Sequence, residues 1–190
     1  QSEEVAWITG SDVNFCAQAF PTVGYDHPDS PILTVLGAVL RNGYLHSAIR
    51  EKGGAYGSGA QQDSASRSFR FFSYRDPKCK ETFNAFNSSI EWSLKSINSE
   101  KLEEGILGVI SSIDKPGSPA GEARSDFNQN IRGIDQAKRK RFRSRVIACS
   151  VERLVEVSRK YLTGIPKRAV ISGKQFEKEI NNLGFSVHNV

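Results

Sequence analysis

Residues 36–59 read LGAVLRNGYLHSAIREKGGAYGSG, and within this stretch a helical pattern gives way to a strand pattern. The change falls at Gly53-Gly54, where glycine adopts the left-handed backbone that ends a helix at little cost. The residues that follow, 55–62, carry two further glycines, and a strand so poor in side chains lets a backbone or a ring approach closely. The stretch therefore predicts a helix, a tight corner and a strand in direct succession.

The helix before this corner begins upstream of the stretch. Ser30 can act as its N-cap and Pro31 can fill its first position, and apolar residues then recur at helical spacing. We expect this helix to continue through Ile49. Asn42-Gly43 can bend or divide it.

The rest of the chain predicts an α+β domain. A strand is expected within 13–25, and a second strand at 66–74 should pair with 55–62 as an antiparallel hairpin. Strands do not alternate strictly with helices, so the order excludes a doubly wound parallel sheet. We expect a mostly antiparallel sheet with helices packed on one side. The remaining predicted elements are helices from Asp76-Pro77, after Asn98-Ser99, near 135–147 and after Ser150, a loop at 116–121, a strand at 169–172, a short helix through Ile180 and an extended end from Phe185.

Composition bounds the class of protein. The 190 residues are 38% hydrophobic and 25% charged, which is typical of a water-soluble globular domain, and the length favours one domain spanning 1–190. No stretch approaches the roughly 18 apolar residues of a membrane-spanning helix, so no membrane partner is expected. Three widely spaced cysteines form no C-x-x-C pair, which fits a reducing intracellular compartment, either a bacterial cytoplasm or an organelle matrix. The chain begins with Gln1 and contains no Met, from which we expect it to be a piece of a longer protein.

The residues give no sign of a metal site. His27, His46 and His188 are isolated in the sequence, and none has another histidine three or four residues away. We therefore expect no metal to be bound by this chain alone. Cys16 lies in a predicted strand, where a buried thiol is more often inert packing than a nucleophile.

Arg50 and Tyr56 are the candidates for chemistry. Arg50 stands at the end of the predicted helix and Tyr56 at the start of the strand, so the corner at Gly53-Gly54 can turn both toward one place. A guanidinium and a phenol are hydrogen-bond donors suited to a peptide carbonyl or a developing oxyanion. The structural alternative is that Arg50 pairs with Glu51 or another acid and that Tyr56 fills a gap over the glycines.

The stretch from Leu45 to Gly57, LHSAIREKGGAYG, together with the run FFSYRDP at 71–77, resembles the last domain of the M16C zinc metallopeptidases. These form the presequence-protease branch of the pitrilysin or insulinase family. The resemblance extends from about Val13 to Leu162. Weaker support comes from PAGE at 119–122 and from GID at 133–135.

The resemblance implies a fold and an activity. Such enzymes have two homologous halves, each of two similar α+β domains, that close around a chamber. Zinc is bound by an H-x-x-E-H helix of the first domain, which this chain lacks. The last domain contributes an Arg and a Tyr, matched here by Arg50 and Tyr56, that contact the substrate backbone, with Gly53 and Gly54 shaping the corner between them. We therefore expect a C-terminal domain, inactive alone, of a zinc-dependent endopeptidase that degrades short unstructured peptides.

The partners expected from this resemblance are an unstructured peptide substrate and the N-terminal domains of the parent chain. Without those domains the fragment exposes a face that can form a homodimer. A second class of function is a non-catalytic M16-like scaffold or peptide-binding module, which an upstream H-x-x-E-H motif would exclude.

The chain has a net charge of +5, and the whole excess of basic over acidic residues lies in a basic run at 138–145, KRKRFRSR. Three interpretations stay open. The run can be a solvated helix face, with Lys138, Arg141 and Arg145 in water and Phe142 and Val146 packed inward. It can line the chamber and attract acidic peptide segments. It can bind nucleic acid, which we rank last, so that no nucleic-acid partner is expected.

Overall fold

The computed structural model describes residues 4–190, so the first three residues of the expected 1–190 domain lie outside the described part. Its centre is a six-stranded sheet with strand order β3-β4-β2-β5-β1-β6. The strands are β1 (Glu4–Thr9), β2 (Asn14–Pro21), β3 (Gly57–Asp63), β4 (Ser68–Asp76), β5 (Lys167–Gly173) and β6 (Ser186–Asn189). The helical elements are α1 (Asp29–Leu40), the π-helix η1 (Arg41–Glu51), α2 (Lys80–Lys95), α3 (Ser99–Ile113), α4 (Pro119–Ile131), α5 (Gln136–Ile147), α6 (Val151–Leu162), the short 3₁₀ segment η2 (Lys174–Phe176) and α7 (Glu177–Asn182).

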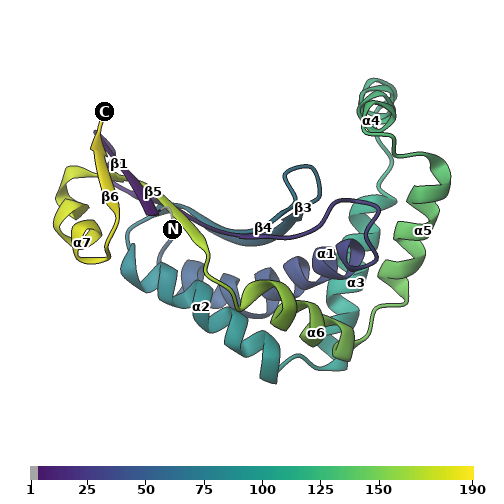
Figure 1. The fold of residues 1–190 in the computed structure, drawn as a ribbon, viewed down its shortest axis with the longest axis horizontal. Helices are drawn as coiled ribbons and strands as arrows, with labels where there is room; N and C mark the ends of the chain where they lie inside the picture. The colour runs from purple at the N-terminus through teal and green to yellow at the C-terminus, as the bar shows by residue number, and fades with distance from the viewer. Residues whose placement is uncertain (1–3) are drawn as a thin grey trace.

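The predicted α+β class is confirmed, with helices on one side of the sheet (Figure 1). Strands β3, β4, β2 and β5 pair antiparallel in that order, and the hairpin of β3 with β4 matches the expected pairing. β1 is parallel to both β5 and β6, and the sequence analysis did not predict β1 at all. The place of β1 between β5 and the edge strand β6 depends on partners that lie more than 150 residues away in sequence.

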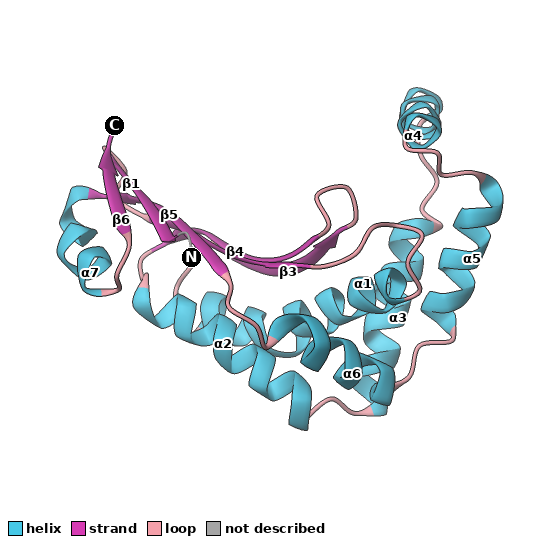
Figure 2. Ribbon diagram, in the orientation of Figure 1, coloured by secondary structure: helices cyan, strands magenta, loops and turns pink. Residues whose placement is uncertain are grey.

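One face of the sheet is covered by helices and the other is open (Figure 2). Along β2 the side chains alternate: Cys16 and Phe20 are buried, whereas Phe15 and Ala17 are exposed. α1, α2 and α6 lie against the covered face, and α3 packs on α1 as a further layer. The buried core between sheet and helices is rich in phenylalanine. It includes Phe69, Phe71, Phe83 and Phe86.

The helix leading to the corner differs from the prediction at its start and in its winding. It begins at Asp29, so Ser30 is not the N-cap and Pro31 is not the first helical residue. The first turn starts earlier because the Ser30 N–H already donates to the His27 carbonyl at 3.0 Å, while the Ser30 hydroxyl is engaged with Ser64. At Arg41 the winding changes from α to π, next to the expected break at Asn42-Gly43.

The segment after α3 holds a helix where the sequence analysis predicted a loop. α4 begins at Pro119, and the Ser118 hydroxyl caps it by accepting a hydrogen bond from the Gly121 N–H at 3.2 Å. Pro119 fills the first helical position, where its missing N–H is not needed, so it starts this helix rather than breaking one. α4 has no buried residue and stands away from the sheet (Figure 1).

Asp76-Pro77 does not open α2 directly, since the helix starts at Lys80. Asp76 ends β4 instead and is buried, and its carboxylate accepts hydrogen bonds from the Lys78 N–H at 2.9 Å and the Thr82 hydroxyl at 2.7 Å. The side chain thus fixes the turn between strand and helix.

The basic run forms α5 and lies on the surface. Val146 is buried, and Phe142 is half-buried and stacked on Tyr25 with ring centroids 4.7 Å apart. Arg141 is exposed, whereas Lys138 and Arg145 are half-buried, and the Lys138 ammonium pairs with Asp26 at 2.9 Å. Phe142 and Val146 thus pack inward as the solvated-face interpretation expects, and the exposure of the basic side chains is common to all three interpretations. No helix within residues 4–190 has both the length and the apolar character that crossing a membrane requires.

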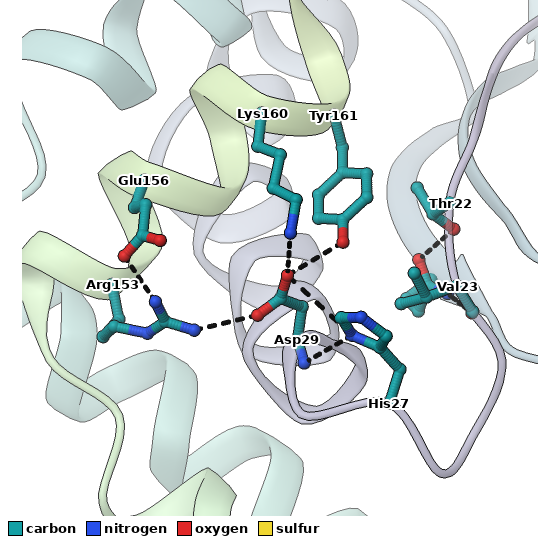
Figure 3. A network of polar contacts seen from close by, with 9 residues as sticks. Thr22, Val23, His27, Asp29, Arg153, Glu156, Lys160 and Tyr161 are labelled. Carbon is teal, nitrogen blue, oxygen red and sulfur yellow. Dashed lines mark hydrogen bonds and ion pairs between the residues drawn. The ribbon is translucent and has the colours of Figure 1, made fainter.

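A buried carboxylate fastens α6 to the start of α1 (Figure 3). Asp29 accepts hydrogen bonds of 2.8 Å each from the Arg153 guanidinium, the Lys160 ammonium and the Tyr161 hydroxyl. Burial acts to raise the pKa of Asp29, but the hydrogen bonds from Lys160 and Tyr161 outweigh it and lower the pKa below its ordinary value. We call this set of residues, with His27, the Asp29 clamp.

Candidate functional site

The corner between η1 and β3 is closed by three backbone hydrogen bonds. The Lys52 N–H donates to the Ser47 carbonyl at 3.0 Å, the spacing of a π-turn. The Gly54 N–H then donates to the Arg50 carbonyl at 3.0 Å, and the Ala55 N–H to the Ile49 carbonyl at 3.1 Å. The chain therefore reverses within four residues and brings the end of the helix next to the start of the strand.

The two glycines at this corner are required by its geometry. A Cβ on Gly53 would lie 2.3 Å from the Ile49 carbonyl oxygen, which no side chain can occupy. Gly54 has a φ of 84°, in the left-handed region that favours glycine. The corner predicted from Gly53-Gly54 is thus present, and neither position accepts another residue without a shift of the backbone.

Tyr56 projects into solvent at the start of β3, where its side chain is 65% exposed. Its N–H donates to the Arg75 carbonyl at 3.2 Å, and the Arg75 guanidinium lies over its ring, 5.6 Å from the centroid. The Tyr74 ring lies beside it, with centroids 5.7 Å apart. Tyr56 does not fill a gap over the glycines; the ring of Tyr74 occupies the space above Gly57.

Arg75 reaches Tyr56 because β4 bulges at this point. The pairing of β2 with β4 shifts register here, so that Tyr74 and Arg75 both lie opposite Phe15. Arg75 has a φ of 48°, one of two non-glycine residues with positive φ among residues 4–190. The sequence analysis quoted Arg75 within FFSYRDP but assigned it no role, because a bulge is a property of strand pairing that the run alone does not show.

Arg50 is exposed on the last turn of η1. Its Nη1 lies 3.5 Å from Nε2 of His46, and Nδ1 of His46 is 3.4 Å from the Glu51 carboxylate. The ion pair of Arg50 with Glu51, which the sequence left open, is therefore not formed; Glu51 contacts His46 instead. Within the described residues no hydrogen bond joins Arg50 to Tyr56, and both side chains are accessible to a ligand.

Other reactive groups in the chain lie away from this corner. Cys16 is buried, and its hydrogen bond with Cys79, together with burial, raises the pKa of its thiol. Burial likewise raises the pKa of Cys149 to about 11. These thiols are protonated and inert at neutral pH. Within residues 4–190 no group of three or more His, Cys, Asp or Glu residues could hold a metal ion, so the residues present do not fit a zinc site.

A cleft of about 660 Å³ lies at the opposite end of β3, beside the hairpin turn. Its lining includes His27, Arg67 and Arg132. β3 is seven residues long, which separates the cleft from Tyr56 by roughly 20 Å. Arg50 and Tyr56 do not line this cleft and lie on an exposed surface.

Comparison with known proteins identifies the family. A sequence model described as the PreP C-terminal domain matches residues 8–164. The chain belongs to this family. The presequence protease, mitochondrial, of Danio rerio is 34% identical over 152 residues, which cover 80% of this chain and 14% of the relative. The chain spans about one seventh of the length of the curated relatives it matches.

Solved structures of more distantly related proteins show the same fold. A protease from Helicobacter pylori superposes with a TM-score of 0.77 at 16% identity, covering 90% of this chain and 44% of the other. A peptidase M16 inactive domain from Pseudomonas fluorescens gives a TM-score of 0.69 at 14% identity, covering 92% and 44%. The expected resemblance to the presequence-protease branch is confirmed, and the sheet with helices on one face is the architecture these proteins share.

Proposed function

We propose that residues 1–190 form a C-terminal domain of a larger zinc-dependent endopeptidase, in which Arg50 and Tyr56 contact the peptide substrate. The observation that carries the proposal is the corner itself. It holds a guanidinium and a phenol on neighbouring, exposed segments, on a backbone that both glycines are needed to form. No core contact requires either side chain to be there.

The chemistry of the two side chains suits them to different roles, with Arg50 positioning the peptide and Tyr56 donating a hydrogen bond to the reacting carbonyl. Arg50 carries a permanent charge and several donors, which suit the carbonyl oxygens of an extended peptide and fix its position. The Tyr56 hydroxyl donates a hydrogen bond to an adjacent carbonyl or to the oxyanion that forms on it. The Arg75 guanidinium over the ring of Tyr56 restricts where that hydroxyl points.

Zinc and its activated water would be supplied by another domain of the parent chain, since the residues described here do not fit a metal site. The fragment alone is accordingly inactive. Its partners are the N-terminal domains and a short unstructured peptide, such as a cleaved targeting sequence. The curated relatives are named as mitochondrial proteins, which favours an organelle matrix over a bacterial cytoplasm. Homodimerisation of the excised domain remains a prediction.

The test is made in the full-length protein. Tyr56→Phe removes only the hydroxyl, and Arg50→Ala removes the guanidinium. We expect each to lower kcat for an unfolded peptide roughly a hundred- to a thousandfold, the usual effect of losing one such donor, while zinc content and unfolding temperature stay unchanged. Tyr25→Phe and Arg41→Ala are the matched controls, because they make the same chemical changes away from the corner, and they should retain turnover.

Near-normal turnover in both Tyr56→Phe and Arg50→Ala would exclude the assigned roles. A full-length protein that cleaves no peptide and has no upstream H-x-x-E-H motif would instead be the non-catalytic scaffold. A chelator distinguishes the two cases, since only the enzyme loses activity when zinc is removed.

A further inference from the structure

The open face of the sheet carries a row of large side chains that crosses every strand. Five strands each contribute one member and Tyr56 lies at the entry to β3, so the order of the members follows the order of the strands. The row runs from Tyr56, which immediately precedes β3, through Tyr74 of β4, Phe15 of β2, Ile171 of β5 and Trp7 of β1 to His188 of β6. We call these six residues the transverse row.

The strand register places four of the members side by side, and ring contact places Tyr56 beside Tyr74, whose own register partner is Gly57. Phe15 pairs directly with Ile171, Ile171 with Trp7, and Trp7 with His188. Directly paired residues point to the same face of a sheet. At the other end Tyr74 lies beside Tyr56, and Phe15 faces the bulge that contains Tyr74. Six strands about 4.8 Å apart make the row about 24 Å long.

The row is exposed although its members are apolar or aromatic. Trp7, Phe15 and Tyr74 are each 39% exposed, and Ile171 is 45% exposed. Their neighbours along each strand, such as Ala6, Cys16 and Val170, are buried against the helices. α1, α2 and α6 pack against the other face of the sheet, and the face that carries the row is open (Figure 2). A row of exposed aromatic and aliphatic side chains is a candidate binding surface.

The next line of residues beside the row is mixed in size: Ala17 and Ala169 are small, and Phe72 covers Gly59 with its ring. One register step along the strands, Gly59 pairs with Phe72, Phe72 with Ala17, and Ala17 with Ala169. The Phe72 ring lies over Gly59, since a Cβ there would be 2.6 Å from the ring. Ala17 and Ala169 are shorter than Phe15 and Ile171 beside them, so the surface is lower next to this part of the row.

We propose that the transverse row binds large apolar side chains of the same peptide that Arg50 and Tyr56 hold, several residues away from the scissile bond. This inference rests on the proposed function. Continuity argues for the peptide as occupant: the row begins at Tyr56 itself, so a chain engaged at the corner passes onto the row without crossing any other element. A second domain of the parent chain is the competing occupant, and the test separates the two.

The variant for the test changes Trp7 and Ile171, the large apolar members of the row that lie farthest from the corner. Trp7→Ser/Ile171→Ser in the full-length protein leaves Arg50 and Tyr56 untouched, because β1 and β5 are separated from β3 by at least two other strands. Leu107→Ser is the matched control: it removes a side chain that is 68% exposed on α3, away from the open face. Ile171→Lys serves as a second, single-site variant should the double variant fold poorly.

Hydrolysis of two peptides of different length tests whether the row binds substrate. A short peptide covers only the residues around the scissile bond, and a long one adds about fifteen residues with large apolar side chains. We expect the row variants to lower kcat/KM for the long peptide about tenfold, through KM, and to leave the short peptide within twofold. Binding of the fluorescein-labelled long peptide to chelator-treated protein should weaken by the same factor.

Two results would overturn the proposal. Unchanged kcat/KM and binding for the long peptide would show that the row does not contact it. Equal losses for both peptides, with a lowered unfolding temperature, would show that another domain covers the row. A failure of the proposed function gives a different result: the Arg50→Ala and Tyr56→Phe variants would then retain turnover of the short peptide.

Discussion

Arg75 does two separate things for Tyr56, and a pair of substitutions can divide them. Its backbone carbonyl accepts the Tyr56 N–H from a left-handed conformation, and its guanidinium covers the Tyr56 ring. Arg75→Gly and Arg75→Ala both remove the guanidinium, but only glycine adopts a φ of 48° without steric cost. We expect Arg75→Gly to be more stable than Arg75→Ala by about 1 kcal/mol in urea unfolding. Both should lower kcat/KM of the full-length enzyme by the same several-fold factor.

If Arg75→Gly and Arg75→Ala had the same free energy of unfolding, the bulge would not be strained at Arg75. An activity loss confined to Arg75→Ala would place the effect in the backbone rather than in the guanidinium.

At single residues, the sequence predicted what depends on local chemistry. Gly53 and Gly54 were identified because a positive φ and the absence of a Cβ are properties of glycine itself, and the exposed positions of Arg50 and Tyr56 follow from that corner. Arg75 was missed because its conformation is imposed by the register of β2 against β4. The contact of Glu51 with His46 was missed because it depends on π rather than α winding.

Among helices and strands too, the elements that depend on a local pattern were predicted and those that depend on distant partners were not. The hairpin and the helices with strong apolar periodicity were predicted, since each carries its own pattern. β1 was missed because its partners β5 and β6 come from the far end of the chain. α4 is not predicted for a different reason: residues 116–121 carry two prolines and two glycines, which favour a loop, although the capping Ser118 followed by Pro119 is a helix start.

The Asp29 clamp predicts how the contact between α1 and α6 responds to pH. The side chain of Asp29 is 7% exposed and accepts three hydrogen bonds from charged or phenolic donors. Asp29→Asn keeps the shape and removes the charge, so we expect it to cost about 2 kcal/mol at pH 6. Because the folded pKa of Asp29 lies below its ordinary value near 3.9, the stabilisation is complete above that value and is lost as pH falls through the folded pKa.

Urea unfolding at pH 6 and at pH 2.5 checks this prediction. The difference in unfolding free energy between the native sequence and Asp29→Asn should shrink toward zero at the lower pH. Asp26→Asn, which removes the carboxylate of an exposed pair with Lys138, should cost less than about 0.5 kcal/mol. A difference for Asp29→Asn that stays constant with pH would mean that the lost energy comes from packing and not from the charge.

Across the whole molecule, burial is distributed unevenly, and local stability should follow it. α6 and α4 have nearly the same length, but Leu154, Val157 and Leu162 of α6 are buried, whereas α4 has no buried residue. Phe127 and Ile131 of α4 are 64% and 71% exposed. Opening α4 therefore exposes almost no new apolar surface, while opening α6 exposes core and breaks the Asp29 clamp.

Hydrogen exchange measured on the chain of residues 1–190 should rank the two helices accordingly. Amides of α4 are expected to exchange at least a hundredfold faster than those of α6, because local opening of α4 breaks hydrogen bonds without disturbing the sheet or its helical cover. The amides of β2 and β4, at the centre of the sheet, should exchange as slowly as those of α6, since both require global unfolding. Equal protection in α4 and α6 would show that something other than burial within this chain sets the order of opening.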